Sequence, residues 1–205
     1  VAHFAVMSLA FFGTITALPL YLQGTLGLSA TESGLVVLPG AVAMGLLGPV
    51  IGRIYDRWGT TVLLVPGTIV VLAILWSFTL LTETTPVWLL VVTQTVLSVG
   101  LAMSFTPLFT ASLGSLQPKY YSYGSATVST VQQVAGAAGI ALLITVMSSV
   151  SAGATAPGAS AAASGAAGAR AAFLLAAIIA TPLLVSAVLI RKPADSIGEG
   201  ARAAH

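Results

Sequence analysis

Six long apolar stretches follow one another along this chain, and they constrain its fold more than any other feature. Each is about as long as the helix of roughly 20 residues that crosses a bilayer. The runs are continuous, whereas strands of a membrane barrel alternate apolar and polar residues. We therefore predict an all-α membrane protein, with one six-helix transmembrane bundle over residues 1–190 and a cytoplasmic tail over 191–205. The predicted spans are 3–23, 34–52, 62–81, 87–113, 125–150 and 171–190.

The scarcity of charge excludes most other classes of protein. Charged residues make up 6% of the 205 positions and hydrophobic residues 57%, whereas a soluble chain is roughly 25% charged. A disordered chain would need low hydrophobicity and high charge. A formal net charge of +2 is too small for the basic surface of a nucleic-acid binder. The expected partner is the lipid bilayer, and no nucleic-acid partner is expected.

The residues that usually carry enzyme chemistry are missing. There is no cysteine, and the two histidines, His3 and His205, lie at opposite ends of the chain. Such a set provides no recognisable zinc site, and no motif pairs a nucleophile with a base. The sequence therefore predicts a protein that is not an enzyme, with no catalytic residue, no metal site and no cofactor.

The basic residues predict an orientation. The second and fourth connections and the tail hold Arg53, Arg57, Lys119, Arg191, Lys192 and Arg202. The remaining basic residue, Arg170, ends the fifth connection, 151–170, whose Ala/Gly/Ser-rich composition predicts a flexible loop. Because basic connections stay in the cytoplasm, both termini are predicted to be cytoplasmic.

A weak internal similarity divides the bundle into two units. Residues 16–21, Thr-Ala-Leu-Pro-Leu-Tyr, are similar to residues 104–109, Ser-Phe-Thr-Pro-Leu-Phe. Both segments lie near the end of the first span of a group of three. Since an odd number of spans inverts the second unit, the pattern predicts two inverted three-helix repeats. Within the second span, Gly48 and Gly52 form a spacing typical of closely packed membrane helices.

One connection carries a specific motif. Residues 52–59, Gly-Arg-Ile-Tyr-Asp-Arg-Trp-Gly, fit the pattern G-x-x-x-D-R-x-G. This segment resembles the loop between the second and third helices of a six-helix half in the major facilitator superfamily. The resemblance implies a gate motif of Gly52, Asp56, Arg57 and Gly59. Gly52 would allow close helix approach, Gly59 would make a turn, and Asp56 would cap a helix or pair with an arginine. The alternative is an ordinary basic turn between two helices.

A closer resemblance extends over about residues 11–150. It rests on Leu-Pro-Leu-Tyr-Leu-Gln at 18–23, Gly-Leu-Val-Val-Leu-Pro-Gly at 34–40, Gly-Leu-Ala-Met-Ser-Phe-Thr-Pro-Leu at 100–108 and Gln-Gln-Val-Ala-Gly at 132–136. These segments are similar to the C-terminal half of the fourteen-helix drug:proton antiporters of that superfamily. The resemblance implies multidrug efflux across the inner cell membrane, with amphipathic, often cationic, compounds exchanged for protons, and hence antibiotic resistance.

No Asp, Glu, Lys or Arg lies in the middle of a predicted span, although such residues usually mark a proton relay. In the family, the coupling carboxylates and an intramembrane arginine lie in the N-terminal half. We therefore expect a C-terminal fragment that the N-terminal half of the same transporter completes. Two alternatives stay open. The chain could be a half-size protein that works only as a homo- or heterodimer, or a membrane partner that transports nothing.

Polar residues inside the spans are the candidates for a substrate cavity. The alternative is that they bond their own helix carbonyls or hold helices together. The candidates for the aromatic walls of the same cavity are Phe11, Phe12, Phe105 and Phe109. The selected polar candidates are Tyr21, Gln23, Gln94, Gln132 and Gln133.

Overall fold

The chain folds into a bundle of long helices. The computed structural model describes residues 2–114, 116–154 and 160–189. No strand occurs among these residues, and six helical spans are long and apolar enough to cross a membrane, the last of them Ala161–Ala187. The predicted all-α, six-span fold is confirmed. The helices are α1 (Ala2–Gly24), α2 (Ala30–Trp58), α3 (Thr61–Phe78), α4 (Val87–Gly114), the short 3₁₀ helix η1 (Pro118–Tyr120), α5 (Tyr121–Gly153), α6 (Ala161–Ala180) and α7 (Leu183–Leu189).

Hydrogen bonds of a capping box start α2 earlier than the predicted span. Ser29 Oγ accepts a hydrogen bond from the amide of Glu32 at 3.2 Å, and Glu32 Oε2 accepts one from the amide of Ser29 at 2.8 Å. These reciprocal bonds satisfy two amides that the helix leaves unpaired at its first turn. The helix therefore begins at Ala30, within the segment predicted to be a connection.

The prediction of a flexible loop over 151–170 is wrong for most of that segment. α5 continues to Gly153, and α6 begins at Ala161, where Ser160 Oγ accepts a hydrogen bond from the amide of Ala163 at 3.0 Å. Alanine is the strongest helix former, and the small residues allow close packing: a Cβ added to Gly168 would meet Ser151 and Met147 of α5. Composition alone suggested a linker because an alanine-rich interface and a flexible loop share the same residues.

The longer sixth helix also changes the position of one charge. Arg170 lies within the membrane-capable span Ala161–Ala187 and not in a connection. The sequence predicted no charged residue in the middle of any span, so this prediction is wrong for the sixth span. The Arg170 side chain is exposed on the surface of α6. At 1.5 Å per residue, Arg170 lies roughly 14 Å from the start of this helix.

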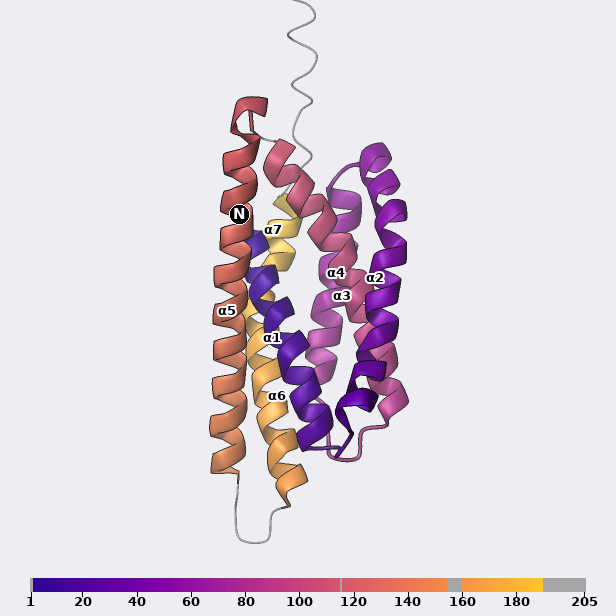
Figure 1. Cartoon of the computed structure of the whole chain (residues 1–205), viewed down its shortest axis with the longest axis vertical. Coiled ribbons are helices and arrows are strands. Elements are labelled where there is room, and N and C mark those ends of the chain that lie inside the picture. The colour runs from indigo at the N-terminus through magenta and orange to yellow at the C-terminus, as the bar shows by residue number, and fades with distance from the viewer. Residues whose placement is uncertain (1, 115, 155–159, 190–205) are drawn as a thin grey trace, which may run out of the picture.

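The helices alternate in direction, so the connections gather at two ends of the bundle. The start of α1, the α2–α3 connection, the α4–α5 connection and the end of α7 lie together (top of Figure 1). Arg53, Arg57 and Lys119 belong to this end, which we call the basic end. The α1–α2 and α3–α4 connections lie at the opposite end, which we call the far end. The predicted tail, 191–205, lies outside the described residues.

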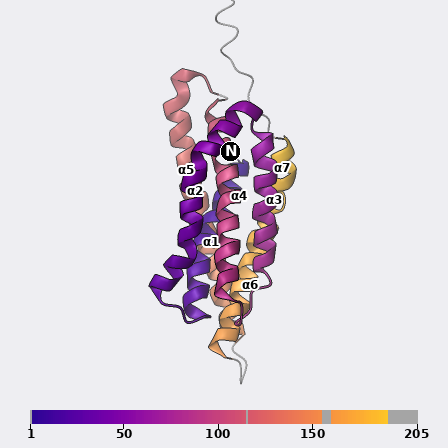
Figure 2. The same ribbon diagram turned by 90° about the vertical axis from the view of Figure 1, so that its right-hand side faces the viewer.

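Helices α1–α3 and α4–α6 form two related groups of opposite direction, and each group packs mainly on the other. α1 runs toward the far end and α4 away from it (Figure 1). The second helix of each unit packs on the first helix of the other, since α5 contacts α1 most extensively and α2 contacts α4. Figure 2 shows α4 lying between α2 and α3 from the side. This exchange is the arrangement that two inverted repeats require.

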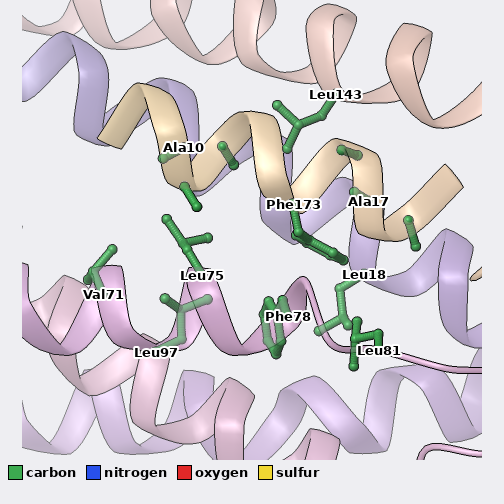
Figure 3. Close-up of a cluster of buried hydrophobic side chains, with 14 of the residues drawn as sticks. Ala10, Ala17, Leu18, Val71, Leu75, Phe78, Leu81, Leu97, Leu143 and Phe173 are labelled. Atoms are coloured by element: carbon green, nitrogen blue, oxygen red, sulfur yellow. The ribbon is translucent and has the colours of Figure 1, made fainter. Parts of the chain in front are cut away.

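Small residues and aliphatic side chains share the interior. Leu9 of α1 crosses Gly139 of α5 so closely that an added Cβ on this glycine would meet the Leu9 carbonyl oxygen. Between α1, α3 and α6, a cluster of fully buried apolar side chains fills the core (Figure 3). There the rings of Phe78 and Phe173 lie 4.9 Å apart. Backbone approach at small residues and dense contact elsewhere are what hold membrane helices together.

Candidate functional site

An open cavity of about 370 Å³ lies where four helices meet. Helices α1, α2, α4 and α5 each contribute to its wall. Its volume is within the range of small-molecule sites in proteins. The lining residues are Phe4, Phe11, Met44, Phe105, Thr106, Phe109, Thr110 and Gln132.

Phenylalanine provides four of the eight residues of this wall. The ring of Phe105 on α4 packs edge-on against Phe4 and against Phe11 of α1, with ring centroids 5.5 Å apart in both pairs. Such edge-to-face pairs are favourable and fix ring orientation. Phe109 lies one helical turn further along α4 and is 38% exposed. The wall therefore offers fixed and accessible aromatic surface to an apolar molecule.

Uncharged polar groups complete the cavity. Thr110 Oγ1 donates a hydrogen bond to the carbonyl oxygen of Thr106 at 3.0 Å, so this hydroxyl is used by its own helix. Gln132 of α5 is half-buried, and its side-chain amide has no hydrogen-bond partner among the described residues. None of the lining residues carries a charge. An amphipathic ligand would therefore find apolar contacts and one free amide.

The predicted polar candidates do not all lie at this cavity. Of the five, only Gln132 lines it. Tyr21 is fully buried, and its hydroxyl donates to the carbonyl oxygen of Thr82 at 2.6 Å, which makes it a structural residue. Gln94 is buried within the bundle, 3% exposed, and does not line the cavity. Gln23 is exposed at the end of α1, and Gln133 is exposed beside the cavity residue.

The aromatic residues of the cavity were predicted more accurately from the sequence than its polar residues. Phe11, Phe105 and Phe109 line the cavity as expected. Phe12 instead packs on Phe11 at 5.0 Å and faces Gly136. Four lining residues were missed: one lies two helical turns before Phe11, two directly follow Phe105 and Phe109 in the sequence, and one lies on α2, for which no cavity residue was predicted. They are Phe4, Met44, Thr106 and Thr110.

The gate motif occupies the last turns of α2 and the residue that ends it. Because α2 continues to Trp58, Asp56 and Arg57 lie on the helix and not in a loop. Gly59 ends the helix with a φ of 84° and donates its amide to the Tyr55 carbonyl oxygen at 2.9 Å. This positive φ favours glycine, so the turn expected at Gly59 is present.

The charged residues of the motif point away from the bundle. Asp56 and Arg57 are both exposed, and the Asp56 carboxylate has no hydrogen bond or ion pair within the described part of the chain. Thr60, the residue before α3, provides no side-chain cap. Among the residues that the structure describes, Asp56 therefore fulfils neither predicted role, capping or pairing, and we propose below a partner on another surface.

The predicted close packing of Gly48 and Gly52 does not occur in this bundle. A Cβ added to either would meet no heavy atom of the described residues within 4 Å. α2 packs on α4 through another face, which holds Gly40 against Ser98. At 100° per residue, Gly45, Gly48 and Gly52 lie on a face beside Met44, the α2 residue of the cavity. An open small-residue face thus borders the cavity.

Helices α2 and α5 are the least covered. Of their most apolar stretches, 17% of the residues are buried, against 44–50% in the other membrane-capable helices. α2 presents an exposed apolar stripe with helical spacing, and this stripe consists of Leu35, Leu38, Val42, Leu46 and Val50. Lipid or another helical surface must cover such faces.

Comparison with known proteins relates this chain to one family of membrane transporters. Residues 1–140 match the family described as Major Facilitator Superfamily. The lincomycin resistance protein LmrB of Listeria monocytogenes is 43% identical over 136 residues, which are 66% of this chain and 29% of that protein. The uncharacterized MFS-type transporter YcnB of Bacillus subtilis is 39% identical over 181 residues, 88% of this chain and 38% of YcnB. A multidrug resistance protein B homolog of Mycobacterium tuberculosis is 31% identical over 140 residues, 67% of this chain and 26% of that protein. The chain thus spans well under half of each relative.

Proposed function

Because this chain belongs to the Major Facilitator Superfamily, we propose that it is the C-terminal six-helix half of a fourteen-helix transporter that exports amphipathic drugs from the cell. The observation that carries the proposal is the open cavity between α1, α2, α4 and α5, with its phenylalanine wall and the free amide of Gln132. Relatives named for lincomycin and multidrug resistance support the same substrate class.

Export would proceed by alternating access across the inner cell membrane. The substrate would lie between this bundle and a second one, and the two would rock to expose it to either side. Phe105, fixed by Phe4 and Phe11, would provide apolar contact. Gln132 would orient the polar part of the substrate. Because the lining carries no charge, we expect the cavity to select substrates by their shape and apolar surface and not by an ionic group.

The gate motif would act at the basic end, which the positive-inside rule assigns to the cytoplasm together with both termini. Asp56 and Arg57 are exposed there. We propose that Asp56 forms a charge-assisted hydrogen bond with a basic residue of the second bundle. That contact would hold the cytoplasmic side closed while the cavity faces outward.

The second bundle would be the N-terminal half of the same transporter and would carry the carboxylates that exchange protons for drug. The uncovered glycine face of α2 supports such packing, because small residues let helix backbones approach closely. There are three alternatives to an N-terminal half. The second bundle could be a second copy of this chain or a separate protein, or the chain could belong to a complex that transports nothing. Sequencing the coding DNA upstream of the Val1 codon separates these cases. Only an N-terminal half of the same transporter requires an open reading frame there that encodes further apolar spans.

The function is tested by drug export from living cells. The complete reading frame that includes this chain and the coding sequence upstream of it would be expressed in a bacterial strain that lacks its own drug exporters, and loss of ethidium fluorescence would be followed after loading. We expect faster loss than in cells with empty vector, and growth at higher lincomycin concentration. Phe105→Ala should reverse both effects, while Tyr123→Ala, which removes an aromatic ring that is 74% exposed, should not. Equal ethidium loss in the presence and absence of the protein would contradict the proposal.

A further inference from the structure

His3 is a buried residue of the bundle, although it stands near the start of the sequence. Its side chain is 5% exposed. The ring Nδ1 lies 2.6 Å from Ser186 Oγ, so the pair joins α1 to α7 across 183 positions of sequence. Nothing in the proposed drug cavity or the gate motif uses this pair.

The hydrogen bonds of Ser186 favour one of the two neutral forms of the His3 ring. Ser186 Oγ donates to the carbonyl oxygen of Leu183 at 3.0 Å. A hydroxyl has a single hydrogen to donate. With that hydrogen on the Leu183 carbonyl oxygen, Ser186 Oγ accepts a hydrogen bond from His3 Nδ1–H. In the neutral ring, Nε2 then holds the free lone pair. This atom is buried and has no hydrogen-bond partner among the described residues.

The charged α-amino group of the chain acts on His3, and few other groups that could titrate surround the pair. Within their described lengths, α3, α4 and α7 contain no Asp, Glu, Lys, Arg or His. α5 adds only Tyr121 and Tyr123, which are 44% and 74% exposed. On α6, Arg170 is close to Tyr21, toward the other end of α1. The charged residues of α2 at this end are exposed, and they are Arg53, Asp56 and Arg57. Arg191 and Lys192, which follow α7 in the sequence, lie outside the described residues.

The pair is adjacent to the aromatic wall. Phe4 follows His3 and packs in a cluster with Leu64, Leu108 and Ala187, the residue after Ser186. Phe4 also lines the cavity, where its ring lies 5.5 Å from that of Phe105. The His3–Ser186 pair is therefore continuous with a residue that lines the cavity.

We propose that His3 is a proton-binding site of this bundle, in which Ser186 holds Nδ1–H and Nε2 takes up the proton. One proton passes from hydronium in the bulk solvent to the Nε2 lone pair, which leaves a water molecule and converts the neutral ring to an imidazolium of charge +1. Transfer of the proton back to water restores the neutral ring. Histidine is the side chain whose charge ordinarily changes nearest to neutral pH, and ionisable residues inside membrane bundles commonly belong to proton paths. For the use of this proton in export, the inference rests on the proposed function.

The test is a histidine titration by nuclear magnetic resonance on the chain in detergent micelles. The chain has two histidines, so His205→Gln leaves His3 as the only nitrogen-15-labelled ring. At neutral pH we expect the chemical shifts of an Nδ1–H ring. Because burial disfavours the charged ring, we expect uptake of one proton only toward the acid end of a titration from about pH 9 down to about pH 3. Ser186→Ala should abolish the preference for Nδ1–H. Ser149→Ala, which removes a hydroxyl that donates to the Val146 carbonyl oxygen of its own helix, should preserve it.

Three results would overturn the inference. They are an Nε2–H ring in the His205→Gln chain, a ring that keeps one protonation state over the whole range, and an unchanged ring in Ser186→Ala. Circular dichroism would establish that each variant remains helical, and the His205→Gln titration is decisive even if Ser186→Ala does not fold. Because no drug and no second bundle are present, a failed titration leaves the export proposal standing. Failed export likewise leaves a positive titration intact.

Discussion

The hydroxyl of Tyr21 donates a hydrogen bond to the carbonyl oxygen of Thr82 at 2.6 Å, and the Tyr21 side chain is completely buried. The bond joins the end of α1 to the connection between α3 and α4. In that connection, Thr82 also donates its amide to Thr85 Oγ1 at 2.8 Å, so the segment is held in a compact turn. A residue that the sequence suggested for substrate contact thus fixes the far end of the bundle.

Tyr21→Phe should destabilise the bundle without changing its fold. Removal of one hydroxyl leaves the Thr82 carbonyl oxygen without this donor, which costs about 1 kcal/mol for a partly buried bond. The measurement is thermal unfolding in detergent, followed by circular dichroism. Tyr123→Phe is the matched control, because that side chain is 74% exposed. Identical melting of the two variants would mean that the Tyr21 bond contributes nothing to stability.

The crossing of α1 and α5 should not tolerate a methyl group. In Gly139→Ala the new Cβ would meet the carbonyl oxygen of Leu9, so the two helices must separate. Such overpacking typically costs about 1 to 3 kcal/mol, and the same melting assay would measure it. Gly45→Ala is the control, since an added Cβ there meets no described atom within 4 Å. If Gly139→Ala melted at the temperature of Gly45→Ala, the close approach would have no energetic importance.

Much of this fold could be predicted from the sequence because long apolar runs leave a chain few alternatives in a membrane. The six spans and their order follow from hydropathy, and the basic connections do lie at one end. The start of α6 did not follow, because alanine, glycine and serine are common both in linkers and in tightly packed membrane helices. The capping box at Ser29 was readable in principle, since serine followed by glutamate three residues later is its usual signature.

The candidate site was harder to predict because the spans are apolar on all sides. In such helices the hydrophobic pattern does not distinguish a face toward the interior from one toward a cavity or lipid. Gln94 and Gln132 look equivalent in the sequence, yet one is buried within the bundle and the other lines the cavity. The aromatic wall was easier, since Phe105 and Phe109 are one turn apart and share a face.

Two neighbouring glutamines provide a direct test of the cavity. Gln132→Ala removes the free amide that lines it, while Gln133→Ala removes one that is exposed beside it. Loss of one hydrogen bond of about 1 kcal/mol corresponds to an affinity about fivefold lower. We expect this change for Gln132→Ala and none for Gln133→Ala when ethidium binding to the chain in lipid nanodiscs is measured by fluorescence anisotropy. A larger effect for Gln133→Ala would place the ligand elsewhere.

Asp56→Asn should impair export while leaving the bundle intact. The carboxylate is exposed and has no partner among the described residues, so its neutralisation should change the free energy of unfolding by no more than about 0.5 kcal/mol. The proposed gate contact is a charge-assisted hydrogen bond worth about 1.5 to 3 kcal/mol, and its loss should slow export about tenfold or more.

The measurement is the rate of ethidium loss from cells that hold equal amounts of protein in the membrane, as determined by immunoblotting. Glu83→Gln is the control, because it makes the same carboxylate-to-amide change at the far end, and the new amide oxygen can still accept the 3.1 Å hydrogen bond from Ser160 Oγ. Undiminished export by Asp56→Asn would remove this residue from the gate. Equal slowing by both variants would point to a general effect of charge and not to the motif.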